Sequence, residues 1–207
     1  MLFVLGLDFI IAGFIIILCL LPLYIYREKI FSIKYEKDDN FSLFINDVKL
    51  HMSKHHPKIK INYAIVEKTK NEENPKLRKS LIIENVAEQF FNFPYEKKTQ
   101  EPISKEKLWA GYAEKSASNP KFPSDWMQRK DLAYRRENRC CNRCGETIIS
   151  INEAHTTFVR EPKDGGGYNF ENIIILCADC NKILNIENQR NALHSLVLND
   201  KLMAFID

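Results

Sequence analysis

The excess of positive over negative charge is small in this sequence, and basic side chains are missing from its start. The 207 residues carry 30 Lys and Arg against 27 Asp and Glu, so the formal net charge is only +3. A net charge this small does not by itself indicate a protein that binds nucleic acid. The chain also has no Lys or Arg before Arg27. A cleaved signal peptide begins with such residues, and no small-residue cleavage site follows the apolar run, so this kind of leader is disfavoured.

Charge is absent altogether from the segment Phe9–Tyr26. At about 1.5 Å per residue, a helix of this length crosses the hydrocarbon core of a bilayer. Tyr24 and Tyr26 lie at one end of it, where their rings suit the membrane interface. Basic residues begin at Arg27 and none precedes the run, so the positive-inside rule places the rest of the chain in the cytoplasm. The sequence therefore predicts a single-pass membrane protein in which residues 1–35 form the anchor and the juxtamembrane segment.

The middle region, residues 36–100, lacks any motif that indicates a ligand. Apolar residues at helical spacing predict an amphipathic helix over Phe41–His55. Alternating apolar and polar residues predict a half-buried strand over Ile59–Ile65. Leu77–Phe91 fits either a strand followed by a helix or a single helix. The region is therefore either a small α+β domain or a spacer from the membrane.

Three histidines, His51, His55 and His56, lie close together at the end of the first predicted helix. A metal site is one explanation for such a cluster. Surface histidines near the C-terminus of a helix are the commoner case, because the helix dipole favours basic side chains there. We therefore predict surface histidines and no metal site at this position.

A linker, Lys97–Pro102, leads into the C-terminal domain, for which we take residues 101–207. Ser104 is placed to cap one helix, and a second helix is predicted over residues 125–137. Its Trp126 is expected to be a packing anchor.

Local charge departs from the overall balance between Arg129 and Cys144, where basic side chains outnumber acidic ones. A basic stripe of this kind suits a phosphate backbone, although a solvated helix face has the same composition. The candidate nucleic-acid-binding residues are Arg135, Arg136, Arg139 and Arg143.

Two Cys-x-x-Cys pairs, Cys141/Cys144 and Cys177/Cys180, carry the most specific signal. Two close pairs that are separated by a few tens of residues have the spacing of a four-thiolate Zn²⁺ site. Cys140 is adjacent to the first pair and has poorer spacing. Pairs on tight turns favour a metal over disulfides in a reducing compartment. We therefore predict a structural zinc that holds two turns together.

The segment between the two pairs predicts a hairpin followed by a helix. Glycines supply the positive φ of a tight turn at Lys163–Tyr168. The first strand would carry Glu153–His155, the second strand is Ile173–Leu176, and the helix begins at Asp179. Zinc would then hold the entry of the first strand to the start of the helix.

The segment from Pro123 to Asn185 resembles the zinc-stapled form of the HNH endonuclease family. The matching residues are Trp126 in DW, CNRCG from Cys141, His155, GGG at Gly165–Gly167, ENI with Asn172 at its centre, and LCADCN from Leu176. The resemblance implies a ββα-metal fold that hydrolyses phosphodiester bonds in DNA. The predicted fold class is α+β: an N-terminal transmembrane helix, a small α+β middle region and a C-terminal HNH-like ββα module with a four-cysteine zinc site.

The resemblance also implies a role for each site residue. His155 would be the general base that activates a water, and Asn172 would hold the hairpin loop. Asn181 would be the helix-borne ligand of a catalytic divalent ion such as Mg²⁺, with Asn185 one turn later as a further candidate ligand.

The position before the proposed base departs from the family pattern. Asp or His normally occupies it and is the principal metal ligand, whereas Ala154 has no donor atom. Asn181 and Asn185 are neutral amides, and a hard ion usually needs a carboxylate, for which Glu153 or Asp179 is the nearest source. Two functions follow: a membrane-anchored, metal-dependent endonuclease, or a catalytically impaired zinc-stabilised module that binds nucleic acid or acts as a scaffold.

Overall fold

The computed structural model of the chain describes residues 13, 16, 18, 20–22, 38–113, 122–185 and 193–206. The chain divides into two compact units, residues 1–44 with residue 207, and residues 45–206. The predicted anchor, Phe9–Tyr26, lies mostly outside the described residues. The predicted domain boundaries near residues 35 and 100 stay predictions.

The prediction of a membrane-spanning helix, and of a single-pass membrane location, is wrong. Among the residues that the structure describes, no helix is both long enough and apolar enough to cross a bilayer. The two long described helices are α3, Asp38–His55, and α5, Pro75–Phe91. Both carry charged side chains along their length, whereas a span requires a nearly uninterrupted apolar stretch.

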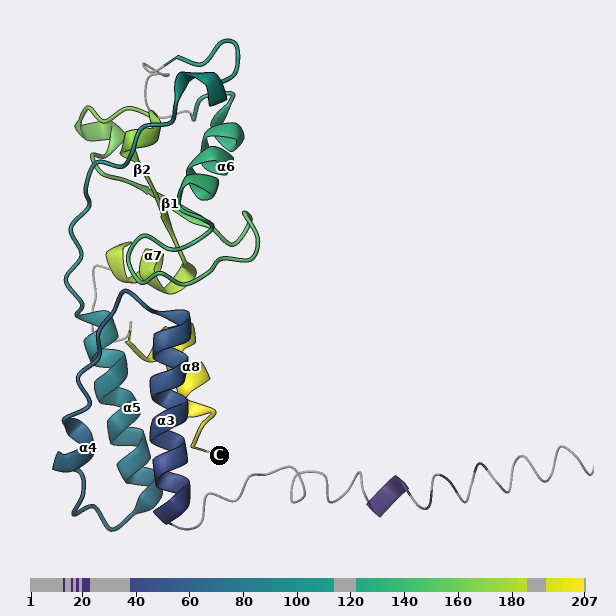
Figure 1. The fold of residues 1–207 in the computed structure, drawn as a ribbon, viewed down its shortest axis with the longest axis vertical. Helices are drawn as coiled ribbons and strands as arrows, with labels where there is room; N and C mark the ends of the chain where they lie inside the picture. Colours follow the sequence, from purple (N-terminus) through teal and green to yellow (C-terminus); the bar gives the residue numbers. More distant parts are fainter. Residues whose placement is uncertain are drawn as a thin grey trace, which may run out of the picture. The chain divides into compact units, whose positions relative to one another are not determined.

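The helical part of the larger unit is built from α3, α5 and α8, Val197–Met203, which lie side by side in Figure 1. Helix α8 packs on α5. His56, at the end of α3, meets the ring of Phe90 on α5 with 4.8 Å between ring centroids. The helix predicted over Phe41–His55 is confirmed and begins slightly earlier. The buried apolar residues are Val48, Met52, Ile82, Ile83, Val86, Ala87, Phe90, Leu198 and Leu202.

The strand predicted over Ile59–Ile65 is wrong, because these residues have no partner strand among the described elements. They have no regular secondary structure until α4, Ile65–Lys68, begins. A side chain replaces the missing neighbour: the Asn62 amide donates to Gln89 Oε1 at 2.7 Å, and Gln89 Nε2 donates to the Asn62 carbonyl at 2.8 Å. Leu77–Phe91, for which the sequence allowed a strand followed by a helix or a single helix, belongs to one helix, α5. Asn74 caps this helix by accepting hydrogen bonds from two backbone N–H groups.

The C-terminal part contains a two-stranded antiparallel sheet, the one sheet of the described structure. Strand β1 is His155–Phe158 and β2 is Ile173–Leu176, in a register that pairs His155 with Leu176. Helix α7, Ala178–Asn185, follows β2 directly and packs on β1. Helix α6, Trp126–Arg136, packs on β2 (Figure 1). Strand β2 pairs with β1 and packs against α6, and it is buried along its whole length.

Several predicted element bounds need correction. Glu153 and Ala154 precede β1 in a turn and do not lie on the strand. The helix that Ser104 was expected to cap is only a short 3₁₀ turn, η1. Trp126 packs against Phe158 and Tyr168, which confirms its role as an anchor. The 3₁₀ turns are η1 Lys105–Lys107, η2 Pro162–Asp164, η3 Phe170–Asn172 and η4 Leu193–Ser195.

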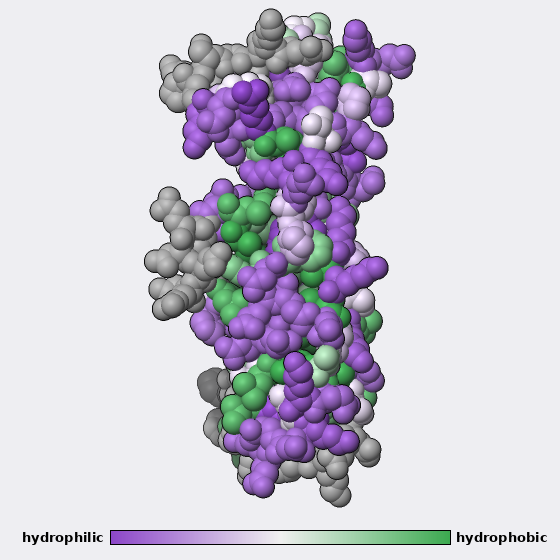
Figure 2. All heavy atoms as spheres, turned by 90° about the vertical axis from the view of Figure 1, so that its left-hand side faces the viewer, coloured by the Kyte–Doolittle hydropathy of each residue, from purple (hydrophilic) through white to green (hydrophobic). Residues whose placement is uncertain are grey.

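The protein is thus a mostly helical α+β fold with a two-strand hairpin and a following helix. Figure 2 shows one face of it, where hydrophilic side chains predominate and hydrophobic ones form separate patches between them. The hairpin and α7 are the parts that carry the predicted site.

Candidate functional site

The four cysteines of the two pairs come together in one buried cluster. Their sulfur atoms all lie within 4.8 Å of one another, and Cys144 Sγ is 3.7 Å from Cys177 Sγ. All four are free thiols. Four sulfur donors around one point match the tetrahedral ligand set of structural zinc. Cys140 lies outside the cluster with its thiol toward the Asn138 carbonyl at 3.4 Å, as its poorer spacing predicted.

Local backbone geometry places each cysteine pair. The first pair lies on a turn closed by the Gly145 amide, which donates to the Cys141 carbonyl at 2.9 Å. Gly145 takes the left-handed φ of 84°, which favours glycine. The Asn142 amide attaches this turn to β2 through the Ile175 carbonyl at 2.9 Å. The second pair spans the β2–α7 junction, so both turns are held beside the same strand.

The thiols influence one another's ionisation. Hydrogen bonds from neighbouring thiols, that of Cys144 first, lower the pKa of Cys141. The hydrogen bond to Cys141 is in turn the main reason that the pKa values of Cys144 and Cys177 are raised. One thiolate is therefore favoured in this cluster and further ones are opposed. A divalent ion would offset the repulsion between the thiolates, because it stabilises all four at once. The cluster therefore fits a zinc site.

His155 is the first residue of β1 and is half-buried. Side chains alternate across a strand, so His155 and Thr157 share one face. Thr157 Oγ1 accepts a hydrogen bond from Lys97 Nζ at 3.0 Å, and that ammonium lies 3.6 Å from Glu161. A cation from outside the hairpin therefore lies on the strand face that carries His155. The sequence placed Lys97 in a linker, and no local pattern there indicated this contact.

Asn172 is buried at the base of the hairpin loop and joins its two sides. Its Nδ2 donates to the carbonyls of Arg160, at 2.9 Å, and Gly167, at 2.6 Å. Its Oδ1 accepts from the Arg160 amide at 2.8 Å. The same close approach requires Gly166, where an added Cβ would lie 1.9 Å from the Arg160 carbonyl oxygen. The position of Asn172 supports its predicted role of holding the loop.

The two asparagines of α7 are paired with each other. Asn185 Nδ2 donates to Asn181 Oδ1 at 2.9 Å. Among the described residues, His155 belongs to no group of three or more His, Cys, Asp or Glu side chains that could hold a metal ion. The Asp179 carboxylate instead accepts the amides of Val197 and Leu198, each at 2.9 Å. The candidate donors for a catalytic ion are therefore neutral amides, which do not by themselves make a site for a hard divalent ion.

The four predicted nucleic-acid-binding arginines divide into two kinds. Arg143 is 1% exposed and donates to the carbonyls of α5's last residues. Arg136 donates to the Phe170 carbonyl at 2.6 Å and the Ile173 carbonyl at 2.8 Å. Both guanidinium groups therefore bind backbone carbonyls of the protein and do not face nucleic acid. Arg135, whose side chain is 69% exposed, and Arg139 face solvent.

The family model described as HNH endonuclease matches residues 141–186. This segment is an HNH endonuclease domain. The matched residues enclose both cysteine pairs, the hairpin and α7, which are the parts that assemble the zinc cluster and His155. No curated protein and no solved structure matches the chain. The matched residues do not include the helical region formed by α3, α5 and α8.

Proposed function

We propose that the HNH domain hydrolyses phosphodiester bonds in DNA, with His155 as the general base. The observation that carries the proposal is the hairpin held by the four-cysteine cluster, which presents His155 at the start of β1 while Asn172 ties the loop at the other end. Family membership suggests a nuclease, and the substrate and the residue roles are our inference.

The residues divide the chemistry between them. The imidazole of His155 would accept a proton from the attacking water, and Asn172 would keep the loop, and so the strand, in one geometry. Lys97, on the same face as His155, would place positive charge beside the phosphate as negative charge develops. A divalent ion, when bound, would stabilise charge on the phosphate and the leaving oxygen, with Asn181 as a candidate ligand.

DNA would be held through its phosphates. Of the predicted arginines, Arg135 and Arg139 are available at the surface. Arg135 pairs with Asp131 at 2.9 Å, an exposed ion pair of small energy that a phosphate can replace. Binding through such contacts weakens as salt rises.

The test is nicking of supercoiled plasmid by the full-length chain with Mg²⁺, Mn²⁺ or Ni²⁺. Replacing His155 with Ala should lower the rate by about 100-fold or more, because general-base catalysis contributes at least that much. His194→Ala, at an exposed histidine of η4, is the matched control and should cleave at the normal rate. Absence of cleavage with every ion, or equal cleavage after His155→Ala, would remove the proposal.

Ala154 favours a second candidate function, a nucleic-acid-binding module that has lost catalysis. This candidate predicts DNA binding that is sensitive to salt, survives His155→Ala, and is lost when Arg135 and Arg139 are both replaced. The plasmid assay separates the two candidates, because only the first predicts a cut strand. Binding that ignores salt would count against the module.

A further inference from the structure

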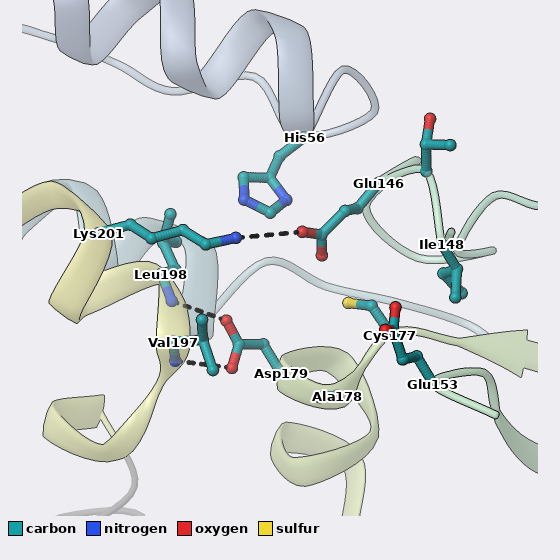
Figure 3. A pocket seen from close by; sticks show the side chains of 11 residues that line it. His56, Glu146, Ile148, Glu153, Cys177, Ala178, Asp179, Val197, Leu198 and Lys201 are labelled. Carbon is teal, nitrogen blue, oxygen red and sulfur yellow. Dashed lines mark hydrogen bonds and ion pairs between the residues drawn. The ribbon is translucent and has the colours of Figure 1, made fainter. Parts of the chain in front are cut away.

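A cavity of about 200 Å³ opens beside the zinc cluster. Figure 3 shows that its walls come from the end of α3, the first cysteine turn, the start of α7 and α8. His56, Glu146, Cys177, Asp179 and Lys201 are among its lining residues. Histidine and carboxylate side chains therefore face one space next to sulfur ligands, outside the site proposed for catalysis.

His56 is the first part of the argument. Its side chain is 2% exposed, and its Nδ1 is buried with no hydrogen-bond partner among the described residues. A buried polar atom without a partner is unfavourable, so a ligand at this atom would stabilise the fold. An imidazole nitrogen that has no hydrogen-bond partner is free to bind a metal ion. The prediction of surface histidines was therefore wrong for His56.

Glu146 and Cys144 complete a ligand set with His56. One donor atom of each of the three residues lies within 4.8 Å of the other two. In Figure 3 the His56 ring and the Glu146 carboxylate point toward the same space. One nitrogen, one oxygen and one sulfur donor form a borderline set, which suits Zn²⁺ better than Mg²⁺ or Ca²⁺. Asp179 is not available to this set, because α8 occupies its carboxylate.

Charge supports a cation at this place. Four thiolates around one divalent ion leave net negative charge, and Glu146 adds a carboxylate beside it. The cations that face this charge are Arg143, 3.5 Å from Cys180 Sγ, and Lys201, 3.7 Å from Glu146. Counted formally, these two cations leave one negative charge unbalanced, so a further cation is attracted to this place.

We propose that His56, Glu146 and Cys144 bind a second Zn²⁺, with the Cys144 sulfur shared between the two ions. A thiolate sulfur has more than one lone pair and can bridge two metals. The second ion would join the end of α3 to the first cysteine turn, and so link the helical region to the HNH domain by a metal. This inference is independent of the proposed nuclease activity.

The experiment measures zinc per full-length chain by mass spectrometry after gel filtration. The wild-type chain should retain about two equivalents, which is one more than the four-cysteine site alone requires. Glu146→Gln and His56→Ala should each lower the content by one equivalent. His55→Ala, a neighbouring half-buried histidine outside the ligand set, should leave it unchanged. A wild-type content of one equivalent, or a second equivalent that both variants keep, would overturn the proposal.

A second measurement on the wild-type chain covers the case in which a variant fails to fold. Loading with ¹¹³Cd²⁺ should give two cadmium resonances of equal area, one from an all-sulfur site and one from a site of mixed donors. Glu146→Gln, which keeps the shape of the side chain, should remove the mixed-donor resonance alone. One resonance from the saturated wild-type chain would rule out the second site whatever the variants do. Neither readout uses cleavage, so failure of the nuclease proposal would leave the result intact.

Discussion

Ala154 presents a methyl group, 3% exposed, one residue before the proposed base. A methyl group cannot bind a metal ion, so this position offers no ligand to a catalytic ion near His155. Weak ion binding is the expected result, since divalent ions of this class usually need at least one carboxylate. At the scale of the residue, this single position decides how strongly the domain can hold a catalytic ion.

Ala154→Asp tests where that ion binds. Without a divalent ion, the new carboxylate should lower the free energy of unfolding by about 1–3 kcal/mol, because it is buried without a partner. Added Mn²⁺ should reverse the loss and raise the cleavage rate. Thermal unfolding with and without Mn²⁺ measures the first effect, and plasmid nicking measures the second. Ala154→Ser is the control for size. Equal destabilisation in both conditions would mean that no ion binds beside this position.

Asn172→Ala should weaken the hairpin loop. The variant loses three hydrogen bonds at about 0.5–1.5 kcal/mol each, so we expect a loss of about 2–4 kcal/mol and slower cleavage. Urea unfolding provides the measurement. Asn169→Ala, which removes a single bond to Glu171 in the same loop, should cost much less. Similar stability of the two variants would argue against a holding role for Asn172.

At the scale of elements, the first cysteine turn caps helix α5. Arg143 Nη2 donates to the carbonyls of Phe90, at 2.6 Å, Phe91 and Phe93, each at 3.1 Å. The last carbonyls of a helix have no partner within it and carry partial negative charge, so a cation there is favourable. The first cysteine turn and the end of α5 are therefore held together by one buried guanidinium.

Arg143→Ala should lower the free energy of unfolding by about 3–5 kcal/mol, since it leaves several buried carbonyls unpaired. Arg135→Ala is the matched control, because its exposed ion pair is worth at most about 1 kcal/mol. DNA affinity should show the opposite order, with a larger loss for Arg135→Ala in folded protein. Chemical unfolding and a salt-dependent binding assay measure the two. A stable Arg143→Ala variant with weakened DNA binding would contradict this division.

At the scale of the whole molecule, hydrogen bonds to the main chain of the first cysteine turn join the helical region to the HNH domain. The Lys58 amide donates to the Cys144 carbonyl at 3.1 Å, and Lys58 Nζ donates to the Asn142 carbonyl at 3.1 Å. A Cβ at Gly145 would lie 2.9 Å from Pro57 Cγ, so the proline ring packs closely against the glycine backbone. The region without a family match is thus built directly onto the cysteine turn.

Removal of zinc should therefore unfold both parts together. Binding of structural zinc is part of the folding free energy, and loss of the turn removes the cap and the contacts of α5. Circular dichroism reports mainly the helices, while fluorescence reports Trp109 and Trp126 near the hairpin. We expect the two signals to fall together as a strong chelator is added and to return with Zn²⁺. A fluorescence change that leaves helicity intact would show that the helical region folds independently.

Patterns that depend only on near neighbours in the chain were predictable. The spacing of the two cysteine pairs predicted the metal cluster, and the apolar run Ile173–Leu176 predicted β2 with its bounds. The alternation over Ile59–Ile65 gave a wrong prediction, because a strand also needs a neighbouring strand. Here the Gln89 side chain forms the hydrogen bonds with the Asn62 backbone that a neighbouring strand would form. Likewise, composition marked Arg143 as basic without showing that its charge is buried.

The four-cysteine cluster, the hairpin with its helix and the family of the domain could be predicted from the amino-acid order, because ligand spacing and side-chain periodicity are local properties. The folded molecule was needed to show which arginines reach solvent, that Lys97 lies on the face of His155, and that His56 faces Glu146 beside the cluster. These outcomes depend on contacts between residues far apart in the chain, and such contacts form only when hydrophobic burial has brought the elements together.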